Sequence, residues 1–374
     1  MYSPLLKEFV WQEHYGNHRF KYNSQSSVIT DRKSYEASLP FIYWKNLEIN
    51  NKLPVAVDDH KYSKKDIRYG RQSFSLRPDM LFGHRPLPKL FPLFHTKSGK
   101  AQIPFPEHLF SMDNKIHFFD GASNKESVRF GEIFDRALAD ADFSFPSKFI
   151  AGKTTNLKPF DEGYFILDDM NHLFHLKFFN SAPAVKKVPL PDNIIPRYIK
   201  ISENRQKKFY GMVIDTKNRL YMLTYDNYNL VRLNLPEYNP DKMKLQLMVN
   251  PIYITARYSD SEKTYAKVFS KNFKPVSEIC VKIPGSEALS ARIVSWIFPF
   301  KIIFTKETSL LTKPELIFGS IKAWYLNFGL AFFYMIFMLK SGYKRKNFIL
   351  PCLCLGVGGL YGIISLLCVK ALLY

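Results

Sequence analysis

Apolar and polar residues alternate along most of the chain after residue 109, with the period expected of half-buried β-strands. Residues 115–119, with the sequence Lys-Ile-His-Phe-Phe, are one example. A helical period interrupts this pattern once, with an apolar face formed by Phe130, Ile133, Phe134, Ala137 and Leu138. The pattern therefore predicts a mainly β domain over residues 109–290, with helical insertions that pack on the sheets.

An internal repeat is the most informative feature of this domain. An aspartate, an asparagine and a leucine return at the same spacing. The copies are Asp168, Asn171 and Leu173, then Asp215, Asn218 and Leu220, with a weaker third copy from Asp260. Because Asp and Asn side chains bond their own backbone in turns, each copy predicts a strand, a turn and a returning strand, with the two leucines buried in equivalent places.

Repeats of about 45 residues built from consecutive antiparallel strands are typical of propeller blades. We therefore expect a propeller-like antiparallel β-repeat domain. Other stacked-sheet repeats would give the same pattern, and two unrelated hairpins are the simplest alternative. Residues 1–108 are irregular and rich in proline. Short helices are predicted there after Pro40 and after Ser63, which resembles a capping box with Asp66.

Two uncharged apolar runs, residues 323–339 and 347–369, follow a juxtamembrane segment at residues 291–322. Each run approaches or exceeds the length with which a helix crosses the hydrocarbon core, where a helix satisfies its own backbone hydrogen bonds. The runs predict a hairpin of two transmembrane helices, and hence a multi-pass protein of the cytoplasmic membrane. Buried helices of a soluble core are the alternative.

The loop between the two runs carries Lys340, Lys344, Arg345 and Lys346 and no acidic residue. Short basic loops stay in the cytoplasm, which would place the β domain outside. The first ten residues contain neither a basic region nor an apolar run that would export such a domain. The two signals conflict. Because the basic loop is intrinsic to the hairpin, we expect the domain to be extracytoplasmic.

Three glycines in the second run, Gly358, Gly359 and Gly362, predict a helix-packing face. Small residues let helix backbones approach closely, so an integral membrane partner could dock there. Packing against the first run of the same chain is the alternative.

The net positive charge indicates which classes of partner the chain favours. The chain has 53 Lys and Arg against 33 Asp and Glu, and five of the basic residues and no acidic residue follow Lys322. The preceding part therefore carries 48 minus 33, or +15, which favours an anionic lipid surface or an acidic partner. No basic cluster interleaved with aromatics indicates nucleic acid. Cys280 is the only cysteine before the apolar runs, so no internal disulfide is expected in the β domain.

No motif indicates a cofactor, a metal or a catalytic centre. Asp168 and Asp215 would make a paired-carboxylate site, but a turn role explains each of them. His172 and His175 would face opposite sides of a strand, so they cannot hold one metal ion together. The stretch around Gly152 lacks the earlier glycine that a phosphate-binding loop needs.

Several segments resemble an uncharacterised family of Bacteroidetes membrane proteins found beside ABC-transporter genes. The segments begin at Tyr2, Leu39, Phe149, Asp161 and Leu173 and are accompanied by the paired C-terminal runs. The resemblance covers nearly the whole chain. It implies structural rather than catalytic motifs, so no site residue is carried over. It also implies an additional membrane helix ahead of the Tyr2 segment, which this sequence lacks.

These patterns favour a membrane-anchored, non-enzymatic accessory or binding protein that works with transporter subunits. The alternative is a membrane-anchored hydrolase that acts on cell-envelope material, with a site assembled from scattered loops. Polar residues gathered in one cleft would favour the hydrolase, and a broad surface would favour the accessory protein.

Overall fold

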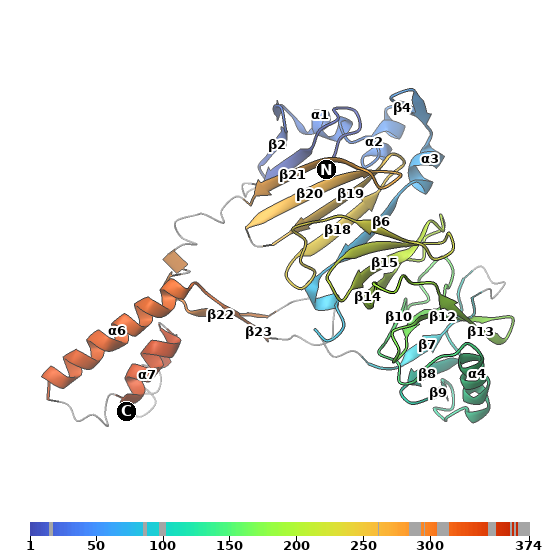
Figure 1. Ribbon diagram of the computed structural model, residues 1–374. Coiled ribbons are helices and arrows are strands. Elements are labelled where there is room, and N and C mark those ends of the chain that lie inside the picture. The colour runs from blue at the N-terminus through green and yellow to red at the C-terminus, as the bar shows by residue number, and fades with distance from the viewer. Residues whose placement is uncertain are drawn as a thin grey trace. The chain divides into compact units, whose positions relative to one another are not determined.

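The structure is a computed structural model of the 374-residue chain (Figure 1). It describes all residues except 15–17, 85–87, 97–101, 261, 284–292, 295, 305–313, 343–348, 360, 363 and 366–374. The chain divides into two compact units, Met1–Lys282 and Ile283–Tyr374.

Four antiparallel sheets follow one another in the first unit (Figure 1). The first sheet contains β7 (Phe91–Leu93), β8 (His108–Met112) and β9 (Ile116–Asp120). The second contains β10 (Phe149–Gly152), β11 (Tyr164–Leu167), β12 (Leu173–Phe179) and β13 (Ala182–Val188). The third contains β14 (Pro196–Ile201), β15 (Phe209–Asp215), β16 (Leu220–Thr224) and β17 (Leu230–Leu233).

The fourth sheet has five strands, because a strand from the N-terminal region joins its edge. It contains β18 (Lys244–Val249), β19 (Tyr253–Ser259), β20 (Lys263–Ser270) and β21 (Pro275–Lys282), with β6 (Gln72–Leu76) beside β18. The prediction of a mainly β fold is therefore confirmed. Among the described residues, the sheets form an open series and none closes into a ring.

The repeated hairpins are β11–β12 and β15–β16. Leu167 pairs with Leu173 in the first hairpin, and Ile214 pairs with Leu220 in the second. Leu173 is 0% exposed and Leu220 is 2% exposed, so both leucines open their strands in equivalent buried places, as the repeat predicted. The third copy is weaker because its turn is shorter by one residue, and the Asp260 N–H already donates to the carbonyl three residues further on.

Apolar side chains fill the space between consecutive sheets. In the first core, α4 (Val128–Asp140) buries Phe134 and Leu138, while Ile133 of the predicted face is 44% exposed. The other two cores meet at β15, whose seven residues are all buried. Alternate side chains of that strand serve different cores: Val213 packs towards the second sheet, and Ile214 packs towards the fourth.

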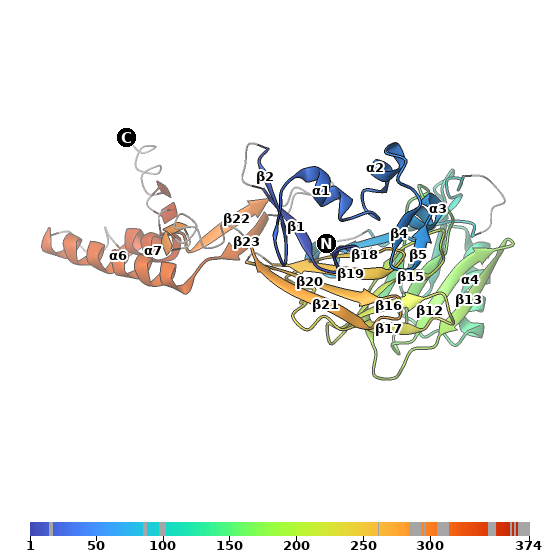
Figure 2. The ribbon, with the colours of Figure 1, turned by 90° about the horizontal axis from the view of Figure 1, so that it is seen from above.

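The N-terminal region covers the free face of the fourth sheet, as Figure 2 shows. Tyr2 and Phe9 pack on Tyr253 and Val268. Ser63 and Asp66 form the predicted capping box at the start of α3. The elements of this region are β1 (Val10–His14), β2 (Phe20–Ser24), β3 (Val28–Ile29), α1 (Arg32–Ala37), α2 (Trp44–Ile49), β4 (Val55–Val57), β5 (His60–Tyr62), α3 (Lys64–Tyr69) and the 3-10 helix η1 (Pro78–Met80). Residues 1–108, treated above as a separate region, thus belong to the same compact unit as the sheets.

The second unit contains a hairpin of two strands and two apolar helices. These are β22 (Phe300–Phe304), β23 (Pro314–Phe318), α6 (Ile321–Lys340) and α7 (Ile349–Gly358). The first predicted span lies inside α6, which has 20 residues. The basic residues 344–346 lie outside the described residues.

The second predicted span, residues 347–369, is described only in part, because residues 347, 348, 360, 363 and 366–369 lie outside the described residues. As far as the structure describes it, α7 has ten residues, or about 15 Å of helix, which is too short to cross a bilayer. Gly359 follows with a positive φ of 55°, and the described residues 361, 362, 364 and 365 beyond it are again helical. Within the described residues, α6 is the one helix long and apolar enough to cross a membrane, so the two-pass hairpin is not supported.

Truncating either repeat leucine should destabilise the first unit. We expect Leu173→Ala and Leu220→Ala each to lower the free energy of unfolding by about 3 kcal/mol, because each leaves a cavity between two sheets. Leu157→Ala is the control, since Leu157 is 84% exposed and should cost less than about 0.5 kcal/mol. Urea titration of the three variants measures this, and a midpoint for either repeat variant as high as that of Leu157→Ala would contradict the burial of that leucine between two sheets.

Candidate functional site: a buried charge cluster

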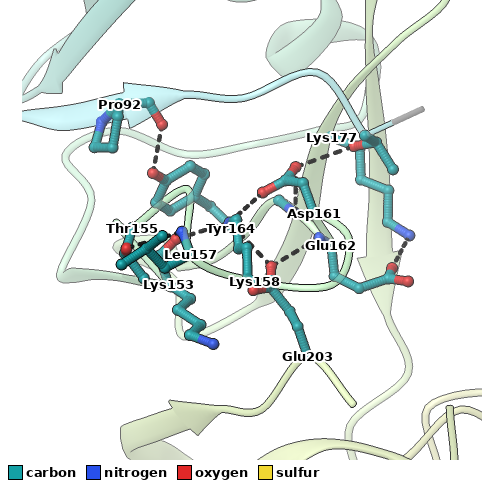
Figure 3. A network of polar contacts seen from close by, with 12 residues as sticks. Pro92, Lys153, Thr155, Leu157, Lys158, Asp161, Glu162, Tyr164, Lys177 and Glu203 are labelled. Carbon is teal, nitrogen blue, oxygen red and sulfur yellow. Dashed lines mark hydrogen bonds and ion pairs between the residues drawn. The ribbon is translucent and has the colours of Figure 1, made fainter. Parts of the chain in front are cut away.

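The loop between β10 and β11 carries a lysine whose charged end lies inside the protein (Figure 3). The Lys158 side chain is 1% exposed, and its Nζ donates to Asp161 Oδ1 at 2.6 Å and to Glu203 Oε1 at 3.1 Å. Nζ also donates to the Lys153 carbonyl oxygen at 2.8 Å and lies 4.4 Å from the centroid of the Phe94 ring. One ammonium group thus joins segments that are distant in the sequence.

The two carboxylates around this ammonium group have different environments. Asp161 Oδ2 accepts hydrogen bonds from the Gly163 N–H at 3.0 Å and from Thr96 Oγ1 at 3.2 Å. Glu203 Oε1 accepts one from the Glu162 N–H at 2.9 Å, whereas its Oε2 is buried without a partner among the described residues. Burial raises the pKa of Glu203 to about 7, although the adjacent ammonium opposes this shift. Glu203 is therefore partly protonated at neutral pH.

Glu162 extends the network towards solvent, as Figure 3 shows for its contact with Lys177. Its carboxylate pairs with Lys177 on β12 and lies 3.5 Å from Lys207 Nζ. The Glu162 side chain is 4% exposed, but those of Lys177 and Lys207 are 25% and 54% exposed. Each carboxylate of the cluster therefore has a lysine beside it, and the outer lysines remain in contact with water.

β12 places a neutral histidine beside the cluster. His175 Nε2 lies 2.5 Å from the Glu162 carbonyl oxygen, so this nitrogen carries the proton, and Nδ1 accepts from the Tyr228 hydroxyl at 2.9 Å. The imidazole stacks on Phe165, with ring centroids 4.1 Å apart. Burial, and then the charge of Lys177, lowers the pKa of His175 to about 3. The side chain therefore stays uncharged at physiological pH.

Two glycines allow the backbone to come close enough for these contacts. Gly163 has a φ of 71°, and a Cβ there would lie 2.1 Å from the Leu176 carbonyl oxygen. A Cβ on Gly152 would lie 2.3 Å from the ring of Tyr164, whose hydroxyl donates to the Pro92 carbonyl at 2.5 Å. The loop that carries Asp161 is thus fixed against β12.

The arrangement suits positioning better than catalysis. Two carboxyl groups in different environments are typical of acid–base sites. The side chains of Lys158, Asp161 and Glu203 are only 1%, 1% and 0% exposed, so a substrate cannot reach them in this conformation. Their contacts instead tie a loop of the second sheet to a loop of the third. Among the described residues, no group of three side chains could hold a metal ion.

The repeat-turn residues lie elsewhere, at the β11–β12 turn and at the β15–β16 turn, which begins with Asp215 at the end of β15. Asp168 and Asp215 are both 0% exposed, and each Oδ1 accepts from the backbone N–H four residues further on, at 2.6 and 2.8 Å. Asn171 and Asn218 have positive φ angles of 65° and 62°, a conformation that asparagine tolerates. In this structure the four side chains shape turns and do not converge on a common site.

The three helix-packing glycines have three different surroundings. A Cβ on Gly358 would meet nothing within 4 Å. One on Gly359 would lie 2.6 Å from Asn327 Nδ2 of α6, and one on Gly362 would lie 2.0 Å from the Cys354 carbonyl oxygen. Two of these glycines therefore accommodate the same chain, and only Gly358 leaves space for something else.

Sequence reasoning did not select the buried cluster. The segments that contain Asp161, Glu162 and Lys177 carried the family resemblance, but nothing marked them as charged partners. Glu203 lies 45 residues after Lys158, and both are in loops, where no periodic pattern predicts neighbours. The one available signal was the presence of acidic residues directly before the apolar β11.

Comparison with known proteins identifies a family. The model described as "Domain of unknown function (DUF4857)" matches residues 1–269. The chain belongs to this family. An uncharacterised family was therefore predicted correctly, while the association of this DUF4857 member with transporter genes stays a prediction. The matched part contains the whole buried cluster.

Similarity to proteins beyond the DUF4857 family is low. No curated protein matches the chain. Among solved structures, "Dihydro-heme d1 dehydrogenase NirN in complex with DHE" is 12% identical with a TM-score of 0.24, over 67% of this chain and 65% of that one. The chain thus covers slightly less than two thirds of NirN. A putative exported protein from Bacteroides fragilis NCTC 9343 is 8% identical with a TM-score of 0.17, over 64% of this chain and 82% of that one. Neither similarity establishes a shared function.

The cluster predicts an unusual dependence of stability on pH. The pKa of Glu203 is raised from 4.5 to about 7, so its contribution to stability is present below pH 4.5 and is lost as pH rises towards 7. The pKa of His175 is lowered from 6.5 to about 3, so its contribution is present above pH 6.5 and is lost as pH falls towards 3. Between about pH 4.5 and 6.5 the two effects oppose each other.

Glu203→Gln removes one of these two opposing effects. We expect its free energy of unfolding to rise with pH between 4.5 and 6.5, relative to the native chain, by about 1.4 kcal/mol per pH unit. Urea unfolding at steps of half a pH unit measures the slope. The exposed Glu237→Gln is the matched control and should follow the native profile. Parallel profiles for Glu203→Gln and the native chain would show that Glu203 titrates normally.

Proposed function

We propose that this DUF4857 protein is a membrane-anchored, non-enzymatic accessory or binding protein that works with an integral membrane partner. The observation that carries the proposal is the surface of α6. Its Tyr325 and Phe333 are each 70% exposed and Phe337 is 64% exposed. A helix of 20 residues is about 30 Å long, which matches the hydrocarbon core of a bilayer. Contact with lipid or with another membrane helix would remove this apolar surface from water, which is favourable.

The β unit supports a binding role. The strand order of the second and third sheets is that of propeller blades, and we propose a propeller-like platform whose loops present a shared surface. The net charge of +20 favours an anionic lipid surface or an acidic partner. The resemblance to proteins found beside ABC-transporter genes is the support for transporter subunits as the partner.

The alternative hydrolase would need accessible acid and base groups. Asp161 and Glu203 have the chemistry of such a pair, but they are 2% and 5% exposed. An accessory role requires no opening of the cluster, so it accounts for the observations with fewer assumptions. Deletion of the gene tests the two roles. If the deletion strain transports less substrate than its parent but hydrolyses cell-envelope material equally well, the accessory role is supported.

We place the β unit outside the cytoplasmic membrane, because Lys340 and the basic residues after it favour the cytoplasm. Ser341 caps the C-terminal end of α6, and Cys280 is exposed in the β unit. If α6 crosses the membrane, these two positions lie on opposite sides. This holds whether or not the chain crosses a second time.

Cysteine labelling tests this topology. In intact cells that express the protein from its native gene, a membrane-impermeant maleimide should label Cys280 but not Ser341→Cys, and lysis should make both reactive. Each cysteine is tested alone, with the other native cysteines replaced by serine. Labelling of Ser341→Cys before lysis, with Cys280 protected, would reverse the assignment of the β unit.

The partner should contact the open glycine position. Gly358→Leu fills a place with no atom within 4 Å, so it should leave the packing of α6 and α7 intact while blocking a close helix approach. We expect it to reduce co-purification of an integral membrane protein in mild detergent several-fold. Gly359→Leu, which would collide with Asn327, reports the effect of disturbing the chain's own packing. Unchanged co-purification with Gly358→Leu would argue against a partner at this face.

A further inference from the structure

A groove lies in the β unit, on the β14–β15 loop that also carries Lys207 of the buried cluster. It has a volume of about 380 Å³. Its walls come from four segments of the chain: the region from β5 to the end of α3, the loop between β14 and β15, and the hairpin turns β18–β19 and β20–β21. The residues used here are His60, Tyr62, Asp66, Gln206, Lys208 and Lys271.

The walls of this groove are fixed to one another. A Cβ on Gly70, at the end of α3, would lie 2.6 Å from Pro251 Cγ, so α3 packs directly on the β18–β19 turn. Gln206 Nε2 donates to the Arg71 carbonyl oxygen at 3.2 Å, and Gln72 donates to Ser202 Oγ at 3.1 Å. The hydrogen bonds hold the β14–β15 loop against the segment after α3. The groove is therefore formed before any ligand enters it.

Two lysines face this groove without a counter-ion. Lys208 is half-buried, and neither Lys208 nor Lys271 forms an ion pair among the described residues. Burial and the nearby charge of Lys271 lower the pKa of Lys208. The carboxylate of Asp66 also lines the groove, but it accepts from Ser63 N–H at 2.8 Å and Ser63 Oγ at 2.7 Å, at the N-terminus of α3. The groove thus keeps an excess of positive charge.

We propose that this groove binds a phosphate group, held by Lys208 and Lys271. Two ammonium groups against the one carboxylate of Asp66 leave the groove with a net positive charge, and lysine binds phosphate as a point charge. Gln206, with Tyr62 and His60, supplies further polar contacts around the same space. Lys208 Nζ lies 5.2 Å from the centroid of the Phe209 ring but has no counter-ion among the described residues, so a bound anion would stabilise the folded state. The phosphate comes either from a soluble phosphate compound or from a lipid headgroup.

The site is independent of the proposed membrane partner, because it needs no second protein. It can therefore be tested on the full chain alone, in nanodiscs of neutral phosphatidylcholine. In the first arm, inorganic phosphate is titrated against chloride at matched ionic strength, and the unfolding temperature is followed. In the second arm, phosphatidic acid replaces part of the neutral lipid and no soluble phosphate is present.

We expect a saturable rise of the unfolding temperature in at least one arm. A response to inorganic phosphate assigns the site to soluble compounds, and a response only to phosphatidic acid assigns it to headgroups. Lys208→Gln and Lys271→Gln should each raise the ligand concentration needed for half of the maximal response about tenfold, because each variant loses one charged contact with the phosphate. Without phosphate, Lys208→Gln should unfold no lower than the native chain, because it removes an unpaired charge.

Lys274→Gln is the matched control, since Lys274 belongs to the same hairpin as Lys271 but does not line the groove. It carries the same change of charge and should respond like the native chain. Lys271 is exposed, so Lys271→Gln keeps the test valid even if Lys208→Gln does not fold. Equal responses of Lys271→Gln and Lys274→Gln would overturn the proposal. So would a native chain that responds to phosphate no more than to chloride and ignores phosphatidic acid.

Discussion

The central sheets have to bury both of their faces, and the first unit is built around that constraint. All four residues of β11 and all seven of β15 are buried, so neither strand can face water. In the fourth sheet, the neighbours Val268 and Phe269 point to opposite faces: Phe269 packs towards the third sheet, and Val268 packs under Tyr2 and Phe9. On the far face of the fourth sheet, the N-terminal segment packs where a further sheet would otherwise be needed to cover the apolar side chains.

At the ends of the strands, the buried charge cluster connects loops of neighbouring sheets through polar contacts, which apolar packing cannot provide. Loops carry backbone polar groups that need partners, and a lysine with two carboxylates supplies several at once. Lys158 connects a loop of the second sheet with Glu203 of the third, and Glu162 passes the connection to Lys177 on β12. Because the desolvation of buried charges offsets much of their mutual attraction, the cluster fixes how the two sheets meet rather than adding much stability.

Two other surfaces lack their complement within the described chain, and they differ in kind. The apolar side chains of α6 are largely exposed, and Lys208 and Lys271 in the groove form no ion pair among the described residues. The buried cluster, by contrast, is nearly satisfied internally. Function is therefore better sought at the two incomplete surfaces, because an incomplete surface gains free energy from a partner and a satisfied one does not.

The sequence by itself determined the local structure: the mainly β fold, the Asp and Asn hairpins, the capping box at Ser63 and the apolar helix within residues 321–340. These depend on periodicity or on contacts between near neighbours. Only the tertiary structure decided that β6 joins the fourth sheet and that Glu203 meets Lys158. Lys208 and Lys271 likewise meet only through folding. Pairings between loops leave no period in the sequence, because the sheets between them set the distance.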